Sequence, residues 1–112
     1  MLTTHFEDHV NKLFVKPADQ LGKQLHAAVG LAGEGGELLD AVKKTWIYGK
    51  EMDMENVLEE CGDALFYVTA MLINSGFTMR QAMDHNYHKL KSRYPDGYTD
   101  AAAIARADKV TS

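Results

Sequence analysis

Four carboxylates in two pairs are the side chains of this chain best suited to chemistry. Glu34 and Glu37 form one pair, Glu60 and Asp63 form the other, and each pair is spaced i, i+3. Side chains at this spacing share one face of a helix. If the two helices pack antiparallel, both pairs converge, and a ligand set made only of carboxylates favours a hard cation such as Mg²⁺, which shares itself with substrate phosphates. The pairs therefore predict a site for a divalent cation and a phosphate-bearing ligand.

The plainer interpretation is that both pairs are solvated acids on unrelated helix faces. Glycines weigh against it, because four of them interrupt the segment that carries the first pair: Gly30, Gly33, Gly35 and Gly36. Each lowers helix stability by about 1 kcal/mol relative to Ala, and so many departures from a local rule are typical of a functional site. Small residues also share the face of Glu34 and would leave room for a ligand: Ala27, Gly30 and Ala41. A break in the helix near residues 33–36 is the alternative.

Positively charged side chains continue an apolar stripe later in the chain, at positions expected to face the core. The stripe begins with apolar residues and continues, in the same direction, as Asn86, Lys89 and Arg93. Polar residues at core-facing positions are errors unless they serve a function, and two cations facing four carboxylates and their metal would suit a polyphosphate. The alternative is that Lys89 and Arg93 reach solvent at the helix end and complement its dipole.

The elements that must position these side chains are helices. Apolar residues recur at the helical period, no segment has the alternation of a strand, and capping or stop signals stand at Pro17, Gly49, Asp53, Gly76 and Pro95. The predicted helices span about residues 4–14, 20–48, 54–75 and 78–93. We expect a single all-α domain over residues 1–112, a bundle of about four helices, with a loosely packed tail from about residue 96 to 112.

The third predicted helix carries the clearest packing signal. One apolar stripe about 100° wide follows it and is expected to form the inner core: Val57, Leu58, Cys61, Leu65, Val68 and Leu72. Cys61 is then a small buried hydrophobe. From Ala64 to Ile73 the helix is apolar around most of its circumference, more than one small bundle can cover. This predicts a homo-oligomer, a dimer or a dimer of dimers.

Composition excludes several other classes of protein. The chain of 112 residues is 46% hydrophobic and carries a formal net charge of −4 with one cysteine. A single cysteine forms no internal disulfide, and the negative charge opposes nucleic-acid binding. No run of 18 apolar residues and no signal-peptide pattern occurs. We therefore expect a cytoplasmic protein with no membrane and no nucleic-acid partner.

Three motifs in order give a resemblance to a known family. They are Gly30-Leu-Ala-Gly-Glu34-Gly-Gly-Glu37, then Glu59-Glu60-Cys-Gly-Asp63, then Asn86-Tyr-His-Lys89-Leu-Lys-Ser-Arg93-Tyr-Pro-Asp-Gly. The chain resembles the MazG-like all-α nucleoside triphosphate pyrophosphohydrolases, whose signature is E-x-x-E followed, after a gap, by E-x-x-D. Here the gap is the 22 residues from Leu38 to Glu59. The resemblance covers about residues 26–98.

This resemblance implies an oligomeric helical bundle that hydrolyses a nucleoside triphosphate to a monophosphate and pyrophosphate. Glu34, Glu37, Glu60 and Asp63 would hold Mg²⁺, with Mn²⁺ as a substitute, and serve as the catalytic set. Asn86, Lys89 and Arg93 would bind the substrate phosphates. Many relatives carry an additional acid before the first motif, a candidate for orienting the attacking water. That position is Gly33 here, which leaves the general base unassigned.

Two rival classes of protein and several details remain open at this stage. A ferritin-like di-metal bundle needs Glu-x-x-His pairs, and the chain has none. A non-catalytic nucleotide-binding or oligomerisation module with the same fold is the alternative that Gly33 supports. Trp46 and Tyr67 are candidates for stacking on the base, although aromatic residues near helix ends more often pack. Base and sugar preference, the number of metal ions, dimer against tetramer, and a cellular or phage role are undetermined.

Overall fold

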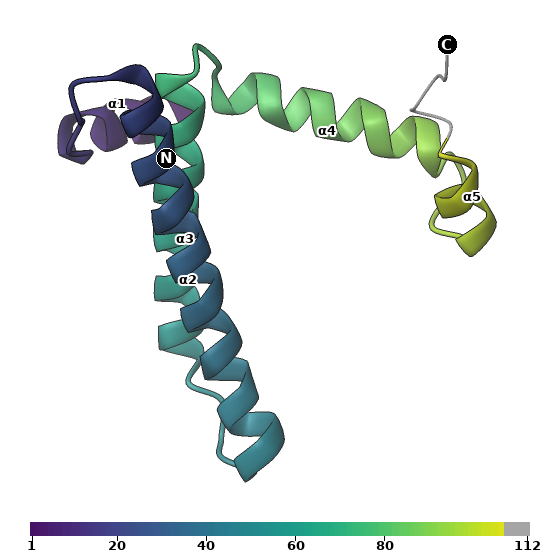
Figure 1. Cartoon of the computed structure of the whole chain (residues 1–112). Helices are drawn as coiled ribbons and strands as arrows, with labels where there is room; N and C mark the ends of the chain where they lie inside the picture. Colours follow the sequence, from purple (N-terminus) through teal and green to yellow (C-terminus); the bar gives the residue numbers. More distant parts are fainter. Residues whose placement is uncertain (107–112) are drawn as a thin grey trace. The chain divides into compact units, whose positions relative to one another are not determined.

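A computed structural model describes residues 1–106 as helices joined by short loops. The chain divides into two compact units, Met1–Thr78 and the part from Met79 onward. The helices are α1 (Thr3–Leu13), α2 (Gln20–Tyr48), α3 (Met54–Asn74), α4 (Met79–Arg93) and α5 (Asp100–Ala105), labelled in Figure 1. No strand occurs among the residues that the structure describes. The predicted all-α fold is confirmed.

A helical hairpin of α2 and α3 dominates the first unit. The Asp19 carboxylate accepts a hydrogen bond from the Gly22 N–H and caps the start of α2, and Asp53 caps α3 by accepting from the Asn56 N–H at 3.1 Å. Gly49, in the left-handed conformation at φ 64°, ends α2. The turn between the helices is short, so α2 and α3 run antiparallel and in contact along their length (Figure 1). Since α2 is continuous, a break near residues 33–36 is excluded.

The far end of the hairpin is closed by polar side chains of α2. The Gln20 side-chain amide donates to the Asn74 carbonyl, and the Gln24 amide donates to the Ser75 hydroxyl at 3.1 Å. Gly76 (φ 83°) turns the chain out of α3 while the Phe77 N–H bonds back to the Leu72 carbonyl at 2.9 Å. This arrangement satisfies the last carbonyls of the helix. Hydrogen bonds thus fix both ends of the hairpin.

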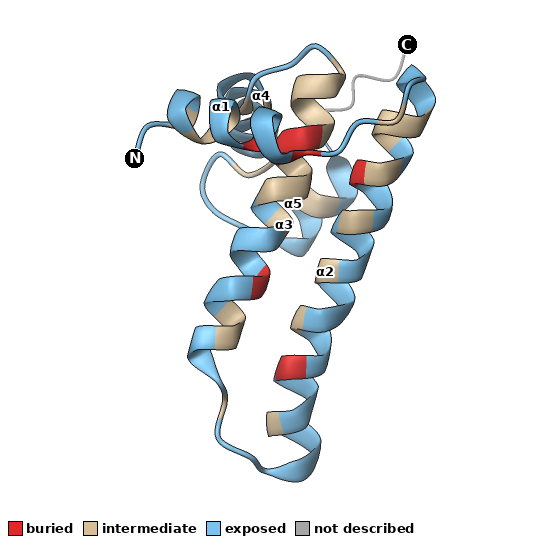
Figure 2. Ribbon diagram, turned by 90° about the vertical axis from the view of Figure 1, so that its left-hand side faces the viewer, coloured by how far each residue is buried: buried red, intermediate tan, exposed pale blue. Residues whose placement is uncertain are grey.

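The buried core of the first unit is small and lies where α1 meets the hairpin. Its cluster consists of Val10, Phe14, Ala27 and Ala70, with the partly buried Phe6, Phe66, Tyr67, Met71 and Ile73 packed against it. His26 stacks on Phe14 with ring centroids 4.6 Å apart, and its Nδ1 lies 2.8 Å from the Val15 carbonyl oxygen. Figure 2 shows most of the hairpin surface exposed, in pale blue.

The face of α3 predicted to form the inner core is the wrong one. Leu58 is 74% exposed and Leu65 is 48% exposed, whereas Glu60 on the neighbouring face is buried. Cys61 is exposed too, so it is not the buried hydrophobe expected from the sequence. Glu60 faces α2, whereas the middle of the apolar stripe is exposed and its other members, Val57, Val68 and Leu72, are half-buried. The helical periodicity correctly identified the residues of the apolar stripe, but it did not indicate which part of the protein the stripe packs against.

The second unit consists of α4 and a short helix that the sequence analysis did not predict. The Thr99 hydroxyl accepts from the Ala102 N–H at 3.0 Å and caps α5. The Tyr98 hydroxyl donates to the Asp100 carboxylate at 3.0 Å. The predicted loose tail therefore contains one helical turn and a half, while its last part, residues 107–112, lies outside the described residues. No helix in residues 1–106 has the length and hydropathy needed to span a bilayer.

Candidate metal centre

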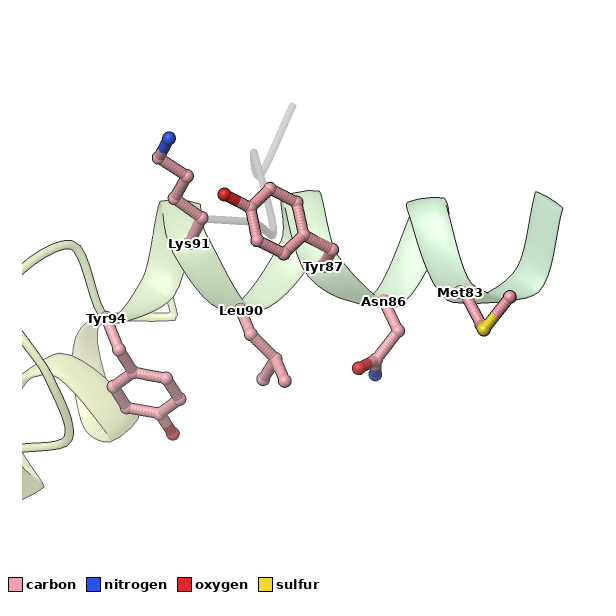
Figure 3. Close-up of a pocket in the computed structure, with 6 residues that line it drawn as sticks. All are labelled: Met83, Asn86, Tyr87, Leu90, Lys91 and Tyr94. Carbon is pink, nitrogen blue, oxygen red and sulfur yellow. The ribbon is translucent and has the colours of Figure 1, made fainter. Parts of the chain in front are cut away.

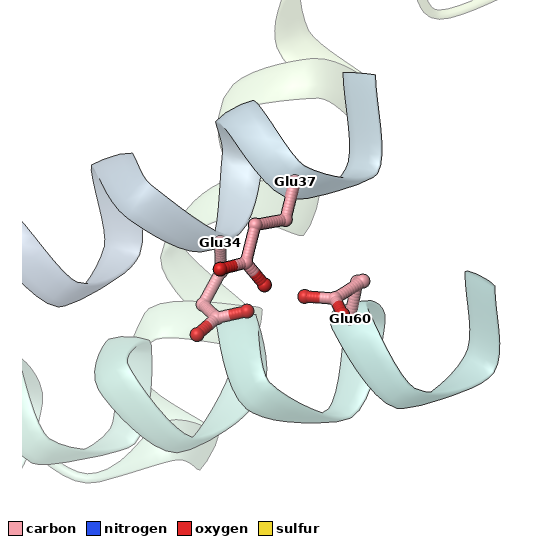
Figure 4. A group of neighbouring side chains, drawn as sticks. All are labelled: Glu34, Glu37 and Glu60. Atoms are coloured by element: carbon pink, nitrogen blue, oxygen red, sulfur yellow. The ribbon is translucent and has the colours of Figure 1, made fainter. Parts of the chain in front are cut away.

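Three of the four predicted carboxylates converge between the two helices of the hairpin. Glu34 and Glu37 project from α2 and Glu60 projects from α3, and Figure 4 shows the three carboxyl groups pointing toward one another. One oxygen of each lies within 4.8 Å of the others. The i, i+3 spacing and the antiparallel packing produce this arrangement, as the sequence analysis expected.

Burial makes this cluster different from a group of solvated acids. Glu60 is only 7% exposed. Among the described residues, the Oε2 atoms of Glu34 and Glu60 are buried and have no hydrogen-bond partner. A buried carboxylate oxygen without a partner is strongly unfavourable unless a cation or donor reaches it. The cluster therefore has the hard-oxygen donors, the excess charge and the unsatisfied atoms that a divalent cation would complete.

The carboxylates also change each other's proton affinity. Hydrogen bonding with Glu34 raises the pKa of Glu60 above 4.5, and desolvation and the charges of Glu34 and Asp63 act in the same direction. Hydrogen bonding with Glu60 and its charge raise the pKa of Glu37 above 4.5, with smaller contributions from desolvation and from Asp63. Like charges held together disfavour the ionised state. A bound cation would reverse this effect.

Asp63 lies beside the cluster and not within it. Its charge raises the pKa of both Glu37 and Glu60, so it is close enough to interact with them. Its side chain is exposed, and it is not among the three residues whose ligand atoms approach within 4.8 Å. The structure thus brings together three of the four predicted ligands and places the fourth at the solvent side.

Gly30 makes room for a side chain of the protein and not for a ligand, which corrects the expectation for this position. A Cβ atom built on Gly30 would lie 2.2 Å from Cε1 of Tyr67. The Tyr67 ring therefore lies directly on the backbone of α2, and it also contacts the Phe66 ring edge to face at 5.3 Å between centroids. Gly30 precedes Glu34 by four residues and Tyr67 follows Asp63 by four, so this contact lies one turn from the acids on both helices. The same four-residue spacing from the acids on both helices was the sequence pattern from which the contact between Gly30 and Tyr67 could have been predicted.

The two aromatic candidates for base stacking lie in different surroundings. Tyr67 is half-buried and packs against the core cluster. Trp46 is 85% exposed and follows Glu37 by nine residues, roughly 14 Å along the helix axis.

The candidate phosphate-binding residues all lie on α4. Met83, Asn86 and Leu90 project from the same side of this helix, whereas Tyr87 and Lys91 project from another (Figure 3). Together with Tyr94 these residues line a groove of about 560 Å³. Lys89 and Arg93 are both half-buried.

Comparison with known families agrees with the helices and the acidic cluster. The MazG nucleotide pyrophosphohydrolase domain matches residues 23–98, which include α3, α4 and all of α2 except its first three residues. The chain belongs to the MazG nucleotide pyrophosphohydrolase family. No curated protein and no solved structure matches the chain significantly.

Proposed function

We propose that this protein is a Mg²⁺-dependent enzyme that hydrolyses a nucleoside or deoxynucleoside triphosphate at the α–β phosphoanhydride. Membership of the MazG family supports a nucleotide pyrophosphohydrolase in general. The observation that carries the finer proposal is the convergence of Glu34, Glu37 and Glu60 with two buried oxygens left without partners. These atoms fit a hard cation, with Mn²⁺ as a substitute for Mg²⁺.

The proposed reaction joins a water oxygen to the α-phosphorus and breaks the bond from this phosphorus to the bridging oxygen. Pyrophosphate leaves with the bridging oxygen, the monophosphate keeps the water oxygen, and the proton goes to solvent. The bound cation would neutralise phosphate charge and lower the pKa of the attacking water. Glu34, Glu37 and Glu60 would hold the cation, and Asp63 would complete this set from its solvent side.

The residues of α4 have a separate part in this proposal. Asn86, Lys89 and Arg93 bind the phosphates of the nucleotide through charge-assisted hydrogen bonds. Trp46 and Tyr67 are the proposed contacts to the base. We further propose a homo-oligomer, a dimer or a dimer of dimers, and a cytoplasmic location, where triphosphates and Mg²⁺ are available.

The test uses purified protein, a panel of nucleoside and deoxynucleoside triphosphates, and water labelled with ¹⁸O. We expect pyrophosphate release that needs Mg²⁺ or Mn²⁺, with the label in the monophosphate. Label in pyrophosphate instead would contradict attack at the α-phosphorus. Nucleotide binding without any turnover would favour the non-catalytic module that Gly33 leaves open.

Matched variants on α3 test the carboxylates. Glu60→Gln removes a buried ligand, whereas Glu59→Gln removes the adjacent exposed acid outside the cluster. We expect Glu60→Gln, Glu37→Gln and Asp63→Asn to abolish turnover while circular dichroism stays helical, and Glu59→Gln to keep turnover within about twofold, as an exposed residue outside the site should. Full turnover in Glu60→Gln would exclude the assignment of this cluster.

A further inference from the structure

The end of α4 is followed by a folded segment that holds two tyrosine rings together. The Tyr94 N–H donates to the Leu90 carbonyl at 2.7 Å, and the Gly97 N–H donates to the Tyr94 carbonyl at 3.3 Å. Gly97 adopts φ 94°, a left-handed conformation that favours glycine, and this residue turns the chain. Beyond the turn, the Tyr98 ring lies against the Tyr94 ring, with 5.1 Å between the ring centroids.

The second of these rings is anchored to α5. The Tyr98 hydroxyl donates to the carboxylate of Asp100, the first residue of α5, at 3.0 Å. Because the neutral hydroxyl is the donor, this bond raises the pKa of Tyr98, with smaller contributions from desolvation and from Tyr94. The bond is therefore kept at neutral pH. We call Tyr94, Tyr98 and Asp100 the aromatic brace.

The aromatic brace contacts the side chain of Arg93. The Arg93 Cζ atom lies 5.9 Å from the centroid of the Tyr94 ring, within the distance at which an aromatic face attracts a guanidinium. Arg93 and Tyr94 are both half-buried. A long side chain such as that of arginine has many rotamers in solution. Contact with a ring that is itself fixed reduces the number of positions that the guanidinium can take.

The charge of α4 indicates what this guanidinium binds. Among the 15 residues of this helix, Arg80, Lys89, Lys91 and Arg93 are cationic and Asp84 is the one acid, whereas the whole chain has a net charge of −4. An anion is therefore attracted to α4 more than to the rest of the protein. A guanidinium is planar and binds two phosphate oxygens at once only when its plane is correctly oriented.

We propose that Tyr94 and Tyr98 are positioning residues, which hold the Arg93 guanidinium in the orientation that binds a phosphate of the nucleotide. This inference rests on the phosphate-binding role proposed above for Arg93. Tyr94 acts through Arg93, and Tyr98 acts through Tyr94. A side chain that is already ordered loses less conformational entropy on binding, so the aromatic brace raises the affinity for nucleotide without contacting it.

Nucleotide affinity in matched variants tests this role. Tyr94→Leu removes the ring and is expected to weaken binding of a non-hydrolysable nucleotide by about 2- to 12-fold, the effect of leaving one long side chain to be ordered on binding. Tyr94→Phe keeps the ring and is expected to bind like the parent protein. The control is Tyr87→Leu, which removes another ring of α4 (Figure 3) from beside a cation, Lys91, whose Nζ lies 5.7 Å from the ring centroid. This control is expected to keep the parental affinity.

A double-variant cycle shows whether Tyr94 acts through Arg93. In protein that already carries Arg93→Ala, Tyr94→Leu and Tyr98→Leu are expected to cause no further loss of affinity. Equal losses with and without Arg93 would show a general structural role and overturn the proposal, as would parental affinity in Tyr94→Leu when Arg93→Ala binds weakly. Parental affinity in Arg93→Ala would instead contradict the phosphate-binding role of Arg93, and the brace would fall with it.

The order of the Arg93 side chain is measured without nucleotide. Relaxation of the Arg93 Nε resonance in the full chain reports motion on the picosecond to nanosecond timescale. We expect restricted motion in the parent protein and in Tyr94→Phe, and larger motion in Tyr94→Leu, with the exposed Arg80 of the same helix as the mobile reference. Equal motion of Arg93 in the parent protein and in Tyr94→Leu would overturn the proposal, whatever the outcome of the enzyme assay.

Discussion

Glu60 is the residue at which burial and charge conflict most directly. It is buried beside two other carboxylates, and one of its oxygens has no partner among the described residues. Its position on α3 was predicted from the i, i+3 spacing. The burial of Glu60 was not predicted. The sequence places the acids next to an apolar stripe, and it does not indicate whether the acids or the stripe pack against the neighbouring helix.

The raised pKa values predict how pH affects the metal-free protein. The folded state binds protons at Glu37 and Glu60 more tightly than the unfolded chain, whose glutamates titrate near 4.5. Between 4.5 and the raised values the folded state therefore holds more protons, and the free energy of unfolding rises as pH falls. Urea unfolding of chelator-treated protein from about pH 7 to about pH 5 measures this rise.

Variants separate these glutamates from other titrating groups. Glu60→Gln is expected to raise stability at neutral pH and to flatten the pH dependence, since it removes one of the repelling charges. Glu59→Gln should follow the parent protein. If the parent and Glu60→Gln curves remain parallel across the whole interval, the carboxylates are not coupled as described.

At the scale of the helices, two glycines of α2 that look alike in the sequence have opposite surroundings. Gly30 lies under the Tyr67 ring, whereas a Cβ atom on Gly33 would meet nothing within 4 Å. Gly30→Ala is therefore expected to destabilise the protein by about 1–3 kcal/mol, because the ring or the helix must move. Gly33→Ala should stabilise it by about 1 kcal/mol through helix propensity alone.

Thermal or urea unfolding of the two variants checks this difference. The comparison is controlled internally, because both changes add the same methyl group to the same helix three residues apart. Equal effects of the two substitutions would show that Tyr67 does not occupy the space above Gly30.

The ends of the helices were predictable because their signals are local. Asp53, Gly49 and Gly76 stand where the caps of α2 and α3 form in the structure. The same kind of signal was present for α5, where Thr99 precedes a run of alanines, but a helix of 6 residues offers no periodicity to detect. The outward direction of the α3 stripe was not predictable, because it depends on which partners exist in space.

At the scale of the whole molecule, the proposed function divides between the two units. The carboxylates lie in the first and the candidate phosphate ligands lie on α4. If Lys89 and Arg93 bind phosphate, Lys89→Ala and Arg93→Ala should each weaken nucleotide binding roughly 10- to 150-fold. Metal binding and the melting temperature of the nucleotide-free protein should stay near those of the parent.

Calorimetric titration with a non-hydrolysable nucleotide, and separately with Mn²⁺, measures the two affinities. Lys12→Ala serves as the control, because Lys12 is an exposed cation of α1 outside every motif. Variants that melt well below the parent protein yet bind nucleotide as tightly would assign Lys89 and Arg93 a structural role as ion-pair partners.

The order of the elements along the chain bears on synthesis in the cell. All four candidate carboxylates precede Thr78, and the hairpin that brings three of them together lies wholly within the unit Met1–Thr78. Domains fold from the N-terminus while the ribosome is still adding residues. A nascent chain that has emerged as far as Thr78 already exposes every proposed metal ligand, before α4 has emerged to bind a phosphate. Cation capture on the ribosome can therefore precede any encounter with nucleotide.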